Sequence, residues 1–442
     1  MLDWLSKSAA ELGRGIGDGT IDPVALTQAF LGAIDSHDLR DVIYSQVTHD
    51  RAMAEAEAAA ERARQGQRLS PLDGVPISWK DLFDTAGVAT EAGSALLEGR
   101  VPDKDARVLQ TATAMGLVCL GKTHMSELAF SGLGYNPMTA TPPCVNDPNA
   151  VPGGSSSGAA ASVAFNLAAA GIGSDTGGSV RIPSAWNDLV GLKTTSHRLS
   201  LEGVVPLCSY FDTVGPLCRT VEDAALFLSV LEGGPAADLR GASMKGVRLA
   251  QINTIGMEDL RDAPRAGYES ARERLQAAGA IVDAVEAPEL AEAMAMTAVL
   301  FTGEAYGEWR GVIEANPHLM FGEILERFRA GAGFSAPDFA DAWKKLEDCR
   351  ARWHARMAGY DAVICPSSPI LPPDKKRLAE DHDYYVTENL LALRNTRIGN
   401  LMGLSGLSLP TGVPSCGIMF LGKPMGEERL LRLGQAAEGA LA

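Results

Sequence analysis

The chain has 442 residues, of which 46% are hydrophobic and 21% are charged, and this balance predicts a globular protein with a large buried core. Asp and Glu (55) outnumber Lys and Arg (39), so the net charge is -16 and bulk electrostatics oppose nucleic acid or an anionic membrane as a direct partner. The longest apolar stretch, residues 159–173, is shorter than the roughly 20 residues that cross a bilayer, so no membrane helix is expected.

The N-terminus and the cysteines bear on the compartment. Asp3 stands among the first residues, and the basic-then-apolar order of a secretory signal is missing there. The cysteines are odd in number, widely spaced and without a CxxC pair: Cys119, Cys144, Cys208, Cys218, Cys349, Cys365 and Cys416. This usage predicts free thiols in a reducing cytoplasm.

The first 66 residues are expected to form an N-terminal helical part. Ser8 and Glu11 have the spacing of a capping box, and Asp22-Pro23 places a helix cap and a first-turn proline before an apolar pattern. Residues 51–65 are rich in alanine and charge, which is typical of a further helix.

From Leu72 onward, short apolar runs separated by glycine replace the helical pattern. Residues 247–252, 268–278 and 280–285 predict a strand, a helix and a second strand, which indicates an α/β fold. Because no fixed-period repeat or long linker divides the chain, we expect one domain over residues 1–442.

Residues 290–397 are expected to be a variable, helix-rich part. Its aromatic residues fit either a core or a region that covers the substrate: Trp309, Phe321, Phe328 and Trp343. Within this part, the charged residues 374–383 are expected to form a solvated loop.

Two short motifs match the sequence without the surroundings that their chemistry needs. Residues 116–123 fit the phosphate-loop pattern, but the residues between the glycines are apolar and predict a strand. Residues 154–158 fit GxSxG, but a proline-rich loop precedes them, whereas a nucleophile elbow follows a strand. The histidines have no HExxH or paired spacing, so no metal site is expected at His124, His197, His318, His354 or His382.

Three other segments carry residues suited to acyl transfer, although each alone also fits a solvated lysine, a flexible linker or a plain turn. Lys80 follows an apolar run and is expected at a strand end, where burial lowers a lysine pKa and makes it a base. Ser155 precedes a helical apolar stretch and is expected at a helix N-terminus. Ser179 follows Gly177 and Gly178, which let backbone N–H groups converge as an oxyanion hole.

Together, these segments resemble the amidase signature family. The residues that carry the resemblance are Lys80, the loop Gly-Gly-Ser-Ser at 153–156 and Asp-Thr-Gly-Gly-Ser-x-Arg-x-Pro at 175–183. Supporting segments extend over nearly the whole chain, at residues 71–76, 121–127, 191–193, 212–216 and 407–412. The resemblance implies a single α/β/α domain, in which helices cover both faces of a large mixed β-sheet.

The resemblance also implies roles for single residues. Lys80 would be the base, Ser155 the bridging serine in a cis peptide, and Ser179 the acylated nucleophile. The oxyanion hole would be formed by the N–H groups of Thr176, Gly177, Gly178 and Ser179. The sequence departs from the family at Ser157, where glycine is more frequent, and this affects the rigidity of the loop more than the chemistry.

The expected function is that of an amidase, which hydrolyses a small carboxamide or related C–N bond to a carboxylate and ammonia or an amine without metal or organic cofactor. The alternative is a glutaminase-type amidase component of a multi-subunit amidotransferase, whose partner would make any RNA contact. A catalytically silent scaffold is disfavoured because all three catalytic positions are filled.

The acyl pocket is expected near residues 125–137, with Ser131 and Tyr135 as substrate-binding candidates, and in the variable part 290–397. No pattern ranks Tyr135 above an ordinary core aromatic residue. The expected partner is a small-molecule amide in the cytoplasm, and a homodimer is compatible with the sequence.

Overall fold

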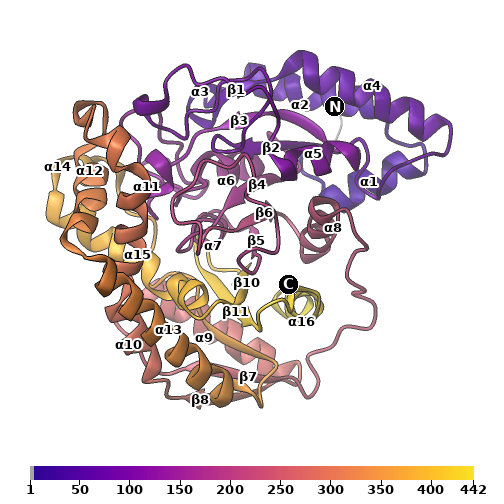
Figure 1. The fold of residues 1–442 in the computed structure, drawn as a ribbon. Helices are drawn as coiled ribbons and strands as arrows, with labels where there is room; N and C mark the ends of the chain where they lie inside the picture. Colours follow the sequence, from indigo (N-terminus) through magenta and orange to yellow (C-terminus); the bar gives the residue numbers. More distant parts are fainter. Residues whose placement is uncertain (1–3) are drawn as a thin grey trace.

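The computed structural model describes residues 4–442, so the expectation that rests on Asp3 lies outside the described residues. A mixed sheet of 11 strands runs through the molecule in the order β1-β3-β2-β4-β6-β5-β10-β11-β9-β7-β8 (Figure 1). The strands are β1 (Tyr44–Val47), β2 (Pro76–Lys80), β3 (Val118–Thr123), β4 (Gly171–Ser174), β5 (Val190–Lys193), β6 (Val214–Cys218), β7 (Arg248–Ile252), β8 (Ile281–Val285), β9 (Ala362–Pro366), β10 (Ser405–Pro410) and β11 (Gly417–Gly422).

Strand directions explain why the sheet is mixed. β2 lies parallel to β3 and β4, and β7 lies parallel to β8 and β9. The other paired strands, including the central β5, β6, β10 and β11, are antiparallel. Helices surround this sheet, which confirms the predicted α/β/α class (Figure 1).

The helices fall into two groups along the chain. The first group is α1 (Ala9–Gly17), α2 (Pro23–Ser36), α3 (Arg40–Ile43), α4 (His49–Arg64), α5 (Arg107–Ala114), α6 (Ser157–Ala164), α7 (Arg181–Trp186), α8 (Val221–Glu232) and α9 (Asp262–Ala277). The second is α10 (Glu289–Ala295), α11 (Gly303–Ile313), α12 (Gly322–Arg329), α13 (Ala336–Met357), α14 (Lys375–Glu380), α15 (His382–Leu401) and α16 (Glu427–Leu441). Short η segments are η1 (Ala95–Leu97), η2 (Glu127–Ala129), the π-helical η3 (Ala298–Thr302), η4 (Pro317–Leu319) and η5 (Ala330–Gly333).

The predicted helix caps near the N-terminus are confirmed. The Ser8 side chain accepts a hydrogen bond from the Glu11 N–H, and Glu11 reciprocates, while Asp22 caps α2. However, the first 66 residues are not all helical, because β1 pairs with β3 at the sheet edge. A strand of four residues that depends on a partner far along the chain leaves only a weak local pattern.

Two further predictions concern the C-terminal half. The expected strand–helix–strand unit is confirmed as β7, α9 and β8, with parallel strands, although α9 begins earlier than predicted. The expected loop at residues 374–383 is wrong, because the segment forms α14 and the start of α15. Asp374 and Asp381 cap these helices by accepting from the N–H groups of Arg377 and Tyr384, so their charges support helix ends.

The strands near the middle of the sheet position the loops that carry the candidate chemistry. β2 ends at Lys80, β4 ends just before the segment 175–180, and α6 begins directly after Ser156. The rejected phosphate-loop pattern lies in β3, as its apolar residues predicted. Across residues 4–442, no helix combines the length and apolar character that a membrane crossing requires.

Candidate active site

Lys80 is fully buried at the C-terminal end of β2, as predicted. Its Nζ lies 2.7 Å from Oγ of Ser155 and 2.7 Å from Oγ of Ser174. Burial lowers the pKa of Lys80 to about 7, although the carboxylates of Asp212 and Asp175 act in the opposite direction. A large fraction of Lys80 is therefore neutral near neutral pH and able to accept a proton.

Ser155 lies in the loop that leads into α6, and the Gly154–Ser155 peptide bond is cis. Gly154 is required there, because a Cβ at this position would lie 2.5 Å from the Gly134 nitrogen and 2.6 Å from Ser126 Oγ. The serine side chain is fully buried and faces Lys80. The expected loop-to-helix location and the cis peptide are both found.

Ser179 lies between β4 and α7, with 3% of its surface exposed. Its carbonyl accepts a hydrogen bond from the Ser156 N–H at 3.3 Å, which ties the two serine-bearing loops together. Within residues 4–442, no hydrogen bond joins Oγ of Ser179 to Oγ of Ser155. Ser179 instead lines a recess of about 20 Å³, large enough for about one water molecule.

The backbone before Ser179 presents free amides. In the described part of the chain, the N–H groups of residues 176–179 have no protein acceptor. The hydroxyl of Thr396 donates to the Gly177 carbonyl at 2.7 Å, so the N–H of Gly178 across the same trans peptide points the opposite way. Gly178 has a φ of 146°, and a Cβ there would lie 2.2 Å from Thr396 Oγ1, so only glycine fits.

Beneath this segment is a buried ion pair. Arg181 Nη2 and Nε lie 2.9 and 3.0 Å from the two carboxylate oxygens of Asp175, and Asn400 donates to Asp175 at 2.9 Å. Although burial opposes ionisation, the charge and hydrogen bonds of Arg181 hold the pKa of Asp175 well below its usual range. Asp175 also accepts from the Val180 N–H at 3.1 Å, which fixes the turn around Ser179.

The second carboxylate near Lys80 belongs to Asp212. The Thr176 hydroxyl donates to it, and the N–H groups of Leu207 and Cys208 donate at 2.9 and 3.1 Å. Burial raises the pKa of Asp212, while the hydrogen bonds and the charge of Lys80 lower it. Asp212 thus anchors Thr176 without forming an ion pair with Lys80.

The two predicted substrate-binding residues have different surroundings. Ser131 lines the recess beside Ser179, and its hydroxyl lies 3.2 Å from both Asn389 Oδ1 and the Tyr385 hydroxyl. Tyr135 packs edge-on against the rings of Phe321 and Tyr385 and lines neither the recess nor the larger cavity next to it. The predicted region around Ser131 therefore borders the site, whereas Tyr135 supports it from behind.

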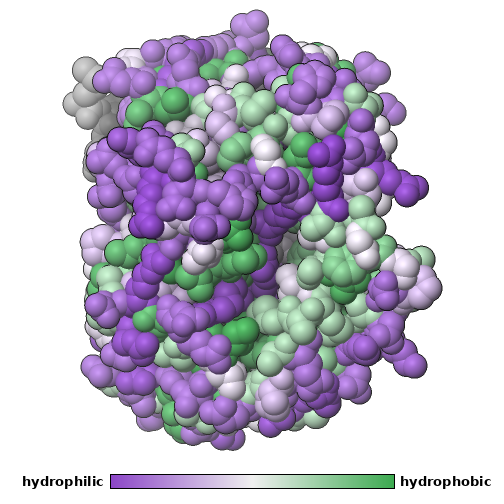
Figure 2. All heavy atoms as spheres, turned by 90° about the vertical axis from the view of Figure 1, so that its left-hand side faces the viewer, coloured by the Kyte–Doolittle hydropathy of each residue, from purple (hydrophilic) through white to green (hydrophobic). Residues whose placement is uncertain are grey.

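A cavity of about 690 Å³ continues outward from the recess. It is lined by η3, α12, α15 and the chain after β7, and Phe301, Arg327 and Arg397 line both spaces. These helices form the left-hand side of Figure 1, and Figure 2 shows that this face is hollowed and that apolar side chains gather around the hollow. The predicted helix-rich part contributes most of the wall.

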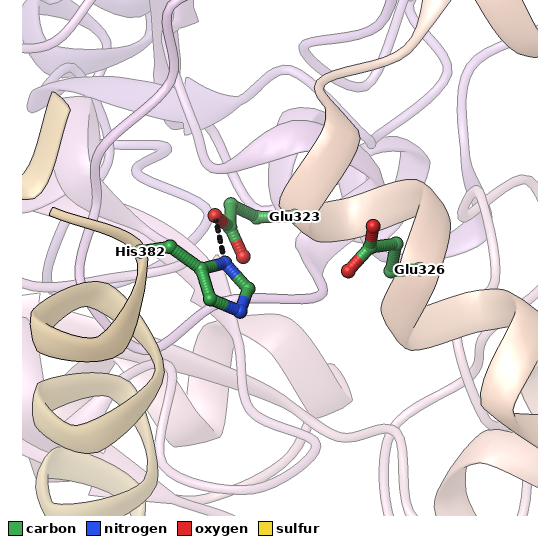
Figure 3. A group of neighbouring side chains, drawn as sticks. All are labelled: Glu323, Glu326 and His382. Atoms are coloured by element: carbon green, nitrogen blue, oxygen red, sulfur yellow. Dashed lines mark hydrogen bonds and ion pairs between the residues drawn. The ribbon is translucent and has the colours of Figure 1, made fainter. Parts of the chain in front are cut away.

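Glu323, Glu326 and His382 meet at the wall of this cavity, where two residues of α12 face the start of α15 (Figure 3). Their ligand atoms lie within 4.8 Å of one another, a spacing that the sequence did not predict because two separate helices supply them. Glu323 Oε1 lies 2.7 Å from His382 Nδ1, and this hydrogen bond raises the pKa of His382. Glu323 and His382 thus bind each other, and exposed acidic groups of this kind are common without a metal ion. This cluster alone does not indicate a metal site.

Other residues of the site were given no role of their own in the sequence analysis. They are Ser174, Asp212, Arg327, Thr396, Arg397 and Asn400. The last three lie in α15, where polar residues are buried on several sides of one helix. In the sequence, the only signal for these residues is a run of polar side chains between leucines in one helical segment, which indicates polar residues on a helix that packs into the interior.

Comparison with known proteins now connects this geometry to a family. Residues 25–431 match the family described as Amidase. The chain is 33% identical to a glutamyl-tRNA(Gln) amidotransferase component from Anaeromyxobacter dehalogenans (strain 2CP-C), over 98% of this chain and 95% of that protein. It is 34% identical to 2-amino-5-chloromuconic acid deaminase of Comamonas testosteroni, over 89% of this chain and 88% of that protein.

Comparison with solved structures leads to the same family. A crystal structure described as an amidase superposes with a TM-score of 0.87 at 28% identity, covering 99% of this chain and 100% of that one. The family match spans the strands and loops that carry Lys80, Ser155 and Ser179. The chain therefore belongs to the amidase signature family, whose members are enzymes that hydrolyse carbon–nitrogen bonds.

Proposed function

We propose that this protein hydrolyses a small carboxamide through an acyl-enzyme on Ser179, with Ser155 as the bridging serine and Lys80 as the base. The observation that carries the proposal is the 2.7 Å contact between Lys80 Nζ and Ser155 Oγ in a fully buried setting. Burial removes the solvation that keeps a lysine charged, and this is how a lysine becomes a base near neutral pH.

The hydrogen bonds of Lys80 support this role. A neutral lysine amine keeps two N–H bonds and one lone pair. If one N–H is donated to Ser174 Oγ, the lone pair is free to accept the proton of Ser155. Ser155 would in turn accept the proton of Ser179, so Ser155 gains one proton as it gives up another and stays neutral.

Acylation follows from this relay. As Ser179 Oγ bonds to the amide carbon, its proton moves to Ser155, and the proton of Ser155 moves to Lys80. The negative charge that develops on the carbonyl oxygen would be stabilised by the free N–H groups of residues 176–179. Reversal of the relay protonates the leaving nitrogen as the C–N bond breaks, which releases ammonia or an amine.

Deacylation uses the same groups with water in place of Ser179. Water gives one proton to the relay and attacks the acyl carbon, and the relay returns this proton to Ser179 Oγ as the acyl–oxygen bond breaks. The acid product keeps the second proton of the water and releases it to solvent, which leaves the carboxylate. The residues named here are sufficient for both half-reactions without a metal or organic cofactor.

The cavity lined by α12, α15 and η3 is proposed as the substrate site, so residues 290–397 act as a substrate-covering part of one amidase domain over residues 1–442. Ser131 would contact the acyl group from the recess. A cytoplasmic location remains a proposal that rests on the spacing of the seven cysteines, all of which are buried without disulfide partners.

A second candidate is a glutaminase-type component of a multi-subunit amidotransferase. It is favoured by the 33% identity over nearly the whole length to a protein named as one component of such an assembly. In this case ammonia released at Ser179 would pass to a partner chain. The isolated protein would then release ammonia from glutamine in preference to simple amides.

The test combines labelling and turnover. A phosphonate probe that reacts with activated serines should modify Ser179, as read by mass spectrometry, and Ser179→Ala should abolish both the label and ammonia release from a panel of amides. Labelling of Ser156 in place of Ser179, or substantial turnover by Ser179→Ala, would refute the assignment. Glutamine in the same panel separates the two candidates.

A further inference from the structure

Two arginines that the relay does not use lie where the large cavity meets the recess beside Ser179. Arg327 comes from α12 and Arg397 from α15, and both line the cavity and the recess. A Cβ on Gly177 would lie 3.7 Å from Cγ and 3.9 Å from Nε of Arg397. The Arg397 side chain therefore lies beside residues 176–179, whose N–H groups are free.

Neither arginine has a carboxylate partner in the described part of the chain. Among residues 4–442, no hydrogen bond or ion pair is formed by Arg397, of which 9% is exposed, and its pKa is lowered to about 9 by burial and by the charge of Arg327. Nη1 of Arg327 is buried without a hydrogen-bond partner, and the guanidinium lies 4.5 Å from the centre of the Phe130 ring.

Two other arginine side chains with little exposed surface are paired with carboxylates. Arg181 is bound by both oxygens of Asp175, and Arg198 is bound by Glu232, Glu427 and Glu428. A buried cation without an anion costs free energy, and an anionic ligand can supply the missing charge. The two free guanidinium groups therefore indicate an anionic ligand.

The carboxylates that line the cavity are those of Glu258, Asp259, Glu323 and Glu326, and none of them forms an ion pair with Arg327 or Arg397. Glu323 is one helical turn before Arg327, but its carboxylate binds His382 (Figure 3). Arg394, one turn before Arg397, lies 3.2 Å from Asp259 and donates to the Glu258 carbonyl. Among the described residues, the cations of this cavity that lack a carboxylate partner are thus Arg327 and Arg397. They lie where the cavity meets the recess that Ser179 lines.

We propose that Arg327 and Arg397 bind a carboxylate of the substrate, so that the enzyme acts on short amides that carry a carboxylate a few bonds from the scissile carbonyl. A planar carboxylate matches the paired donors of a guanidinium. Because the Arg397 side chain lies beside Gly177, we expect only a short distance between the carboxylate of the substrate and its scissile carbonyl. This inference rests on the proposed function, since it names the substrate class of the same site.

Matched substrates test the inference with the wild-type enzyme. Malonamate and succinamate carry a carboxylate where 3-methylbutanamide and 4-methylpentanamide carry a neutral isopropyl group of similar shape. We expect kcat/KM for at least one acid to exceed that of its neutral counterpart by about 100-fold. Neutral amides hydrolysed as well as both acids would overturn the inference.

Binding to a variant that cannot react separates the two proposals. Calorimetry with Ser179→Ala should detect the preferred acid, and adding Arg397→Met should weaken it at least about tenfold. Arg394→Met is the matched control, because it removes a cation of the same cavity that already has a partner, and it should change affinity less than about threefold. Arg327→Met gives the same readout if Arg397→Met fails to fold.

The outcomes are distinct. If Ser179 is neither labelled nor needed for turnover, the proposed function fails, whereas binding of the acid to Ser179→Ala still measures the arginines alone. If Ser179→Ala binds neither acid, or binds inorganic phosphate more tightly than both, the carboxylate site is refuted. If both arginine variants bind the acid as tightly as their parent, the inference is also refuted.

Discussion

Lys80 Nζ and Ser155 Oγ are 2.7 Å apart in the interior, and Lys80 has no ion-pair partner within the described chain. The two carboxylates that influence it are bound by other donors, Asp175 by Arg181 and Asp212 by Thr176. Burial therefore determines the protonation of the amine more than charge pairing does, and a single side chain connects the fold to the pH at which the enzyme can work.

The first prediction is the pH dependence of acylation. Because only neutral Lys80 accepts a proton and its pKa lies at about 7, kcat/KM should rise through pH 7 to a plateau and fall about tenfold per pH unit below it. The measurement is kcat/KM between pH 5 and 9 on an amide that does not titrate there. A profile that is flat across pH 7 would remove Lys80 as the base.

The second prediction separates the serines. Ser179→Ala removes the hydroxyl that we propose is acylated, so turnover should fall to background. Ser155→Ala breaks the relay, but water can partly bridge the gap, so its loss of kcat should be smaller. Lys80→Ala should lower the rate and also abolish the rise through pH 7.

The control for these variants is Ser156→Ala. Ser156 is buried next to Ser155, but its hydroxyl donates to the Ser174 carbonyl and faces neither Lys80 nor the recess. Its kcat should change less than about tenfold, an effect of the size expected from one neutral hydrogen bond. A loss as large as that of Ser179→Ala would mean that the nucleophile has been misassigned.

The third prediction concerns Thr396, which donates to the Gly177 carbonyl and so orients the Gly178 N–H. Thr396→Val keeps the shape but removes the donor, so kcat should fall about 10- to 100-fold with a smaller change in KM. Thr396→Ser keeps the donor and should restore most of the rate. If Thr396→Val and Thr396→Ser lower kcat equally, the packing of the Thr396 side chain, and not its hydrogen bond to Gly177, supports the rate.

Much of this site was predictable because its signals are local. The apolar run before Lys80 and the small residues around Ser155 and Ser179 predicted a strand end and two tight loops, and these are found. The capping box at Ser8 is equally local, since both of its partners lie within four residues.

The residues that were missed act over long distances. Thr396 reaches a carbonyl 219 residues away, and Asn400 reaches Asp175 225 residues away. Pairing of β1 with β3 and the meeting of Arg327 with Arg397 likewise depend on the assembled sheet and helices. Periodicity describes one segment at a time, so such contacts become visible only when the fold brings the segments together.

The fourth prediction concerns the cysteines. All seven are buried and free, so no covalent cross-link stabilises the fold. Adding a reducing agent should leave the melting temperature unchanged, as measured by circular dichroism. A large decrease on reduction would show that a disulfide forms in solution.

The fifth prediction concerns the buried pair of Asp175 and Arg181, which supports the turn that carries Ser179. Asp175→Asn keeps the size of the side chain but leaves the Arg181 charge uncompensated. The expected loss is about 3–5 kcal/mol in the free energy of unfolding, measured by urea denaturation at pH 7. Because the folded-state pKa of Asp175 is held below its unfolded value, the pair stabilises the wild-type protein above about pH 4 and loses this effect on acidification.

The matched control is Arg14→Met, which breaks the exposed pair of Arg14 and Glu222. Water solvates both charges there, so the free energy of unfolding should change by about 1 kcal/mol or less. The difference between the two variants measures the effect of burial on an ion pair in one protein. If Asp175→Asn and Arg14→Met lower the free energy of unfolding by the same small amount, the negative charge of Asp175 does not stabilise the fold. In that case, hydrogen bonds that asparagine can partly replace support the turn at Ser179.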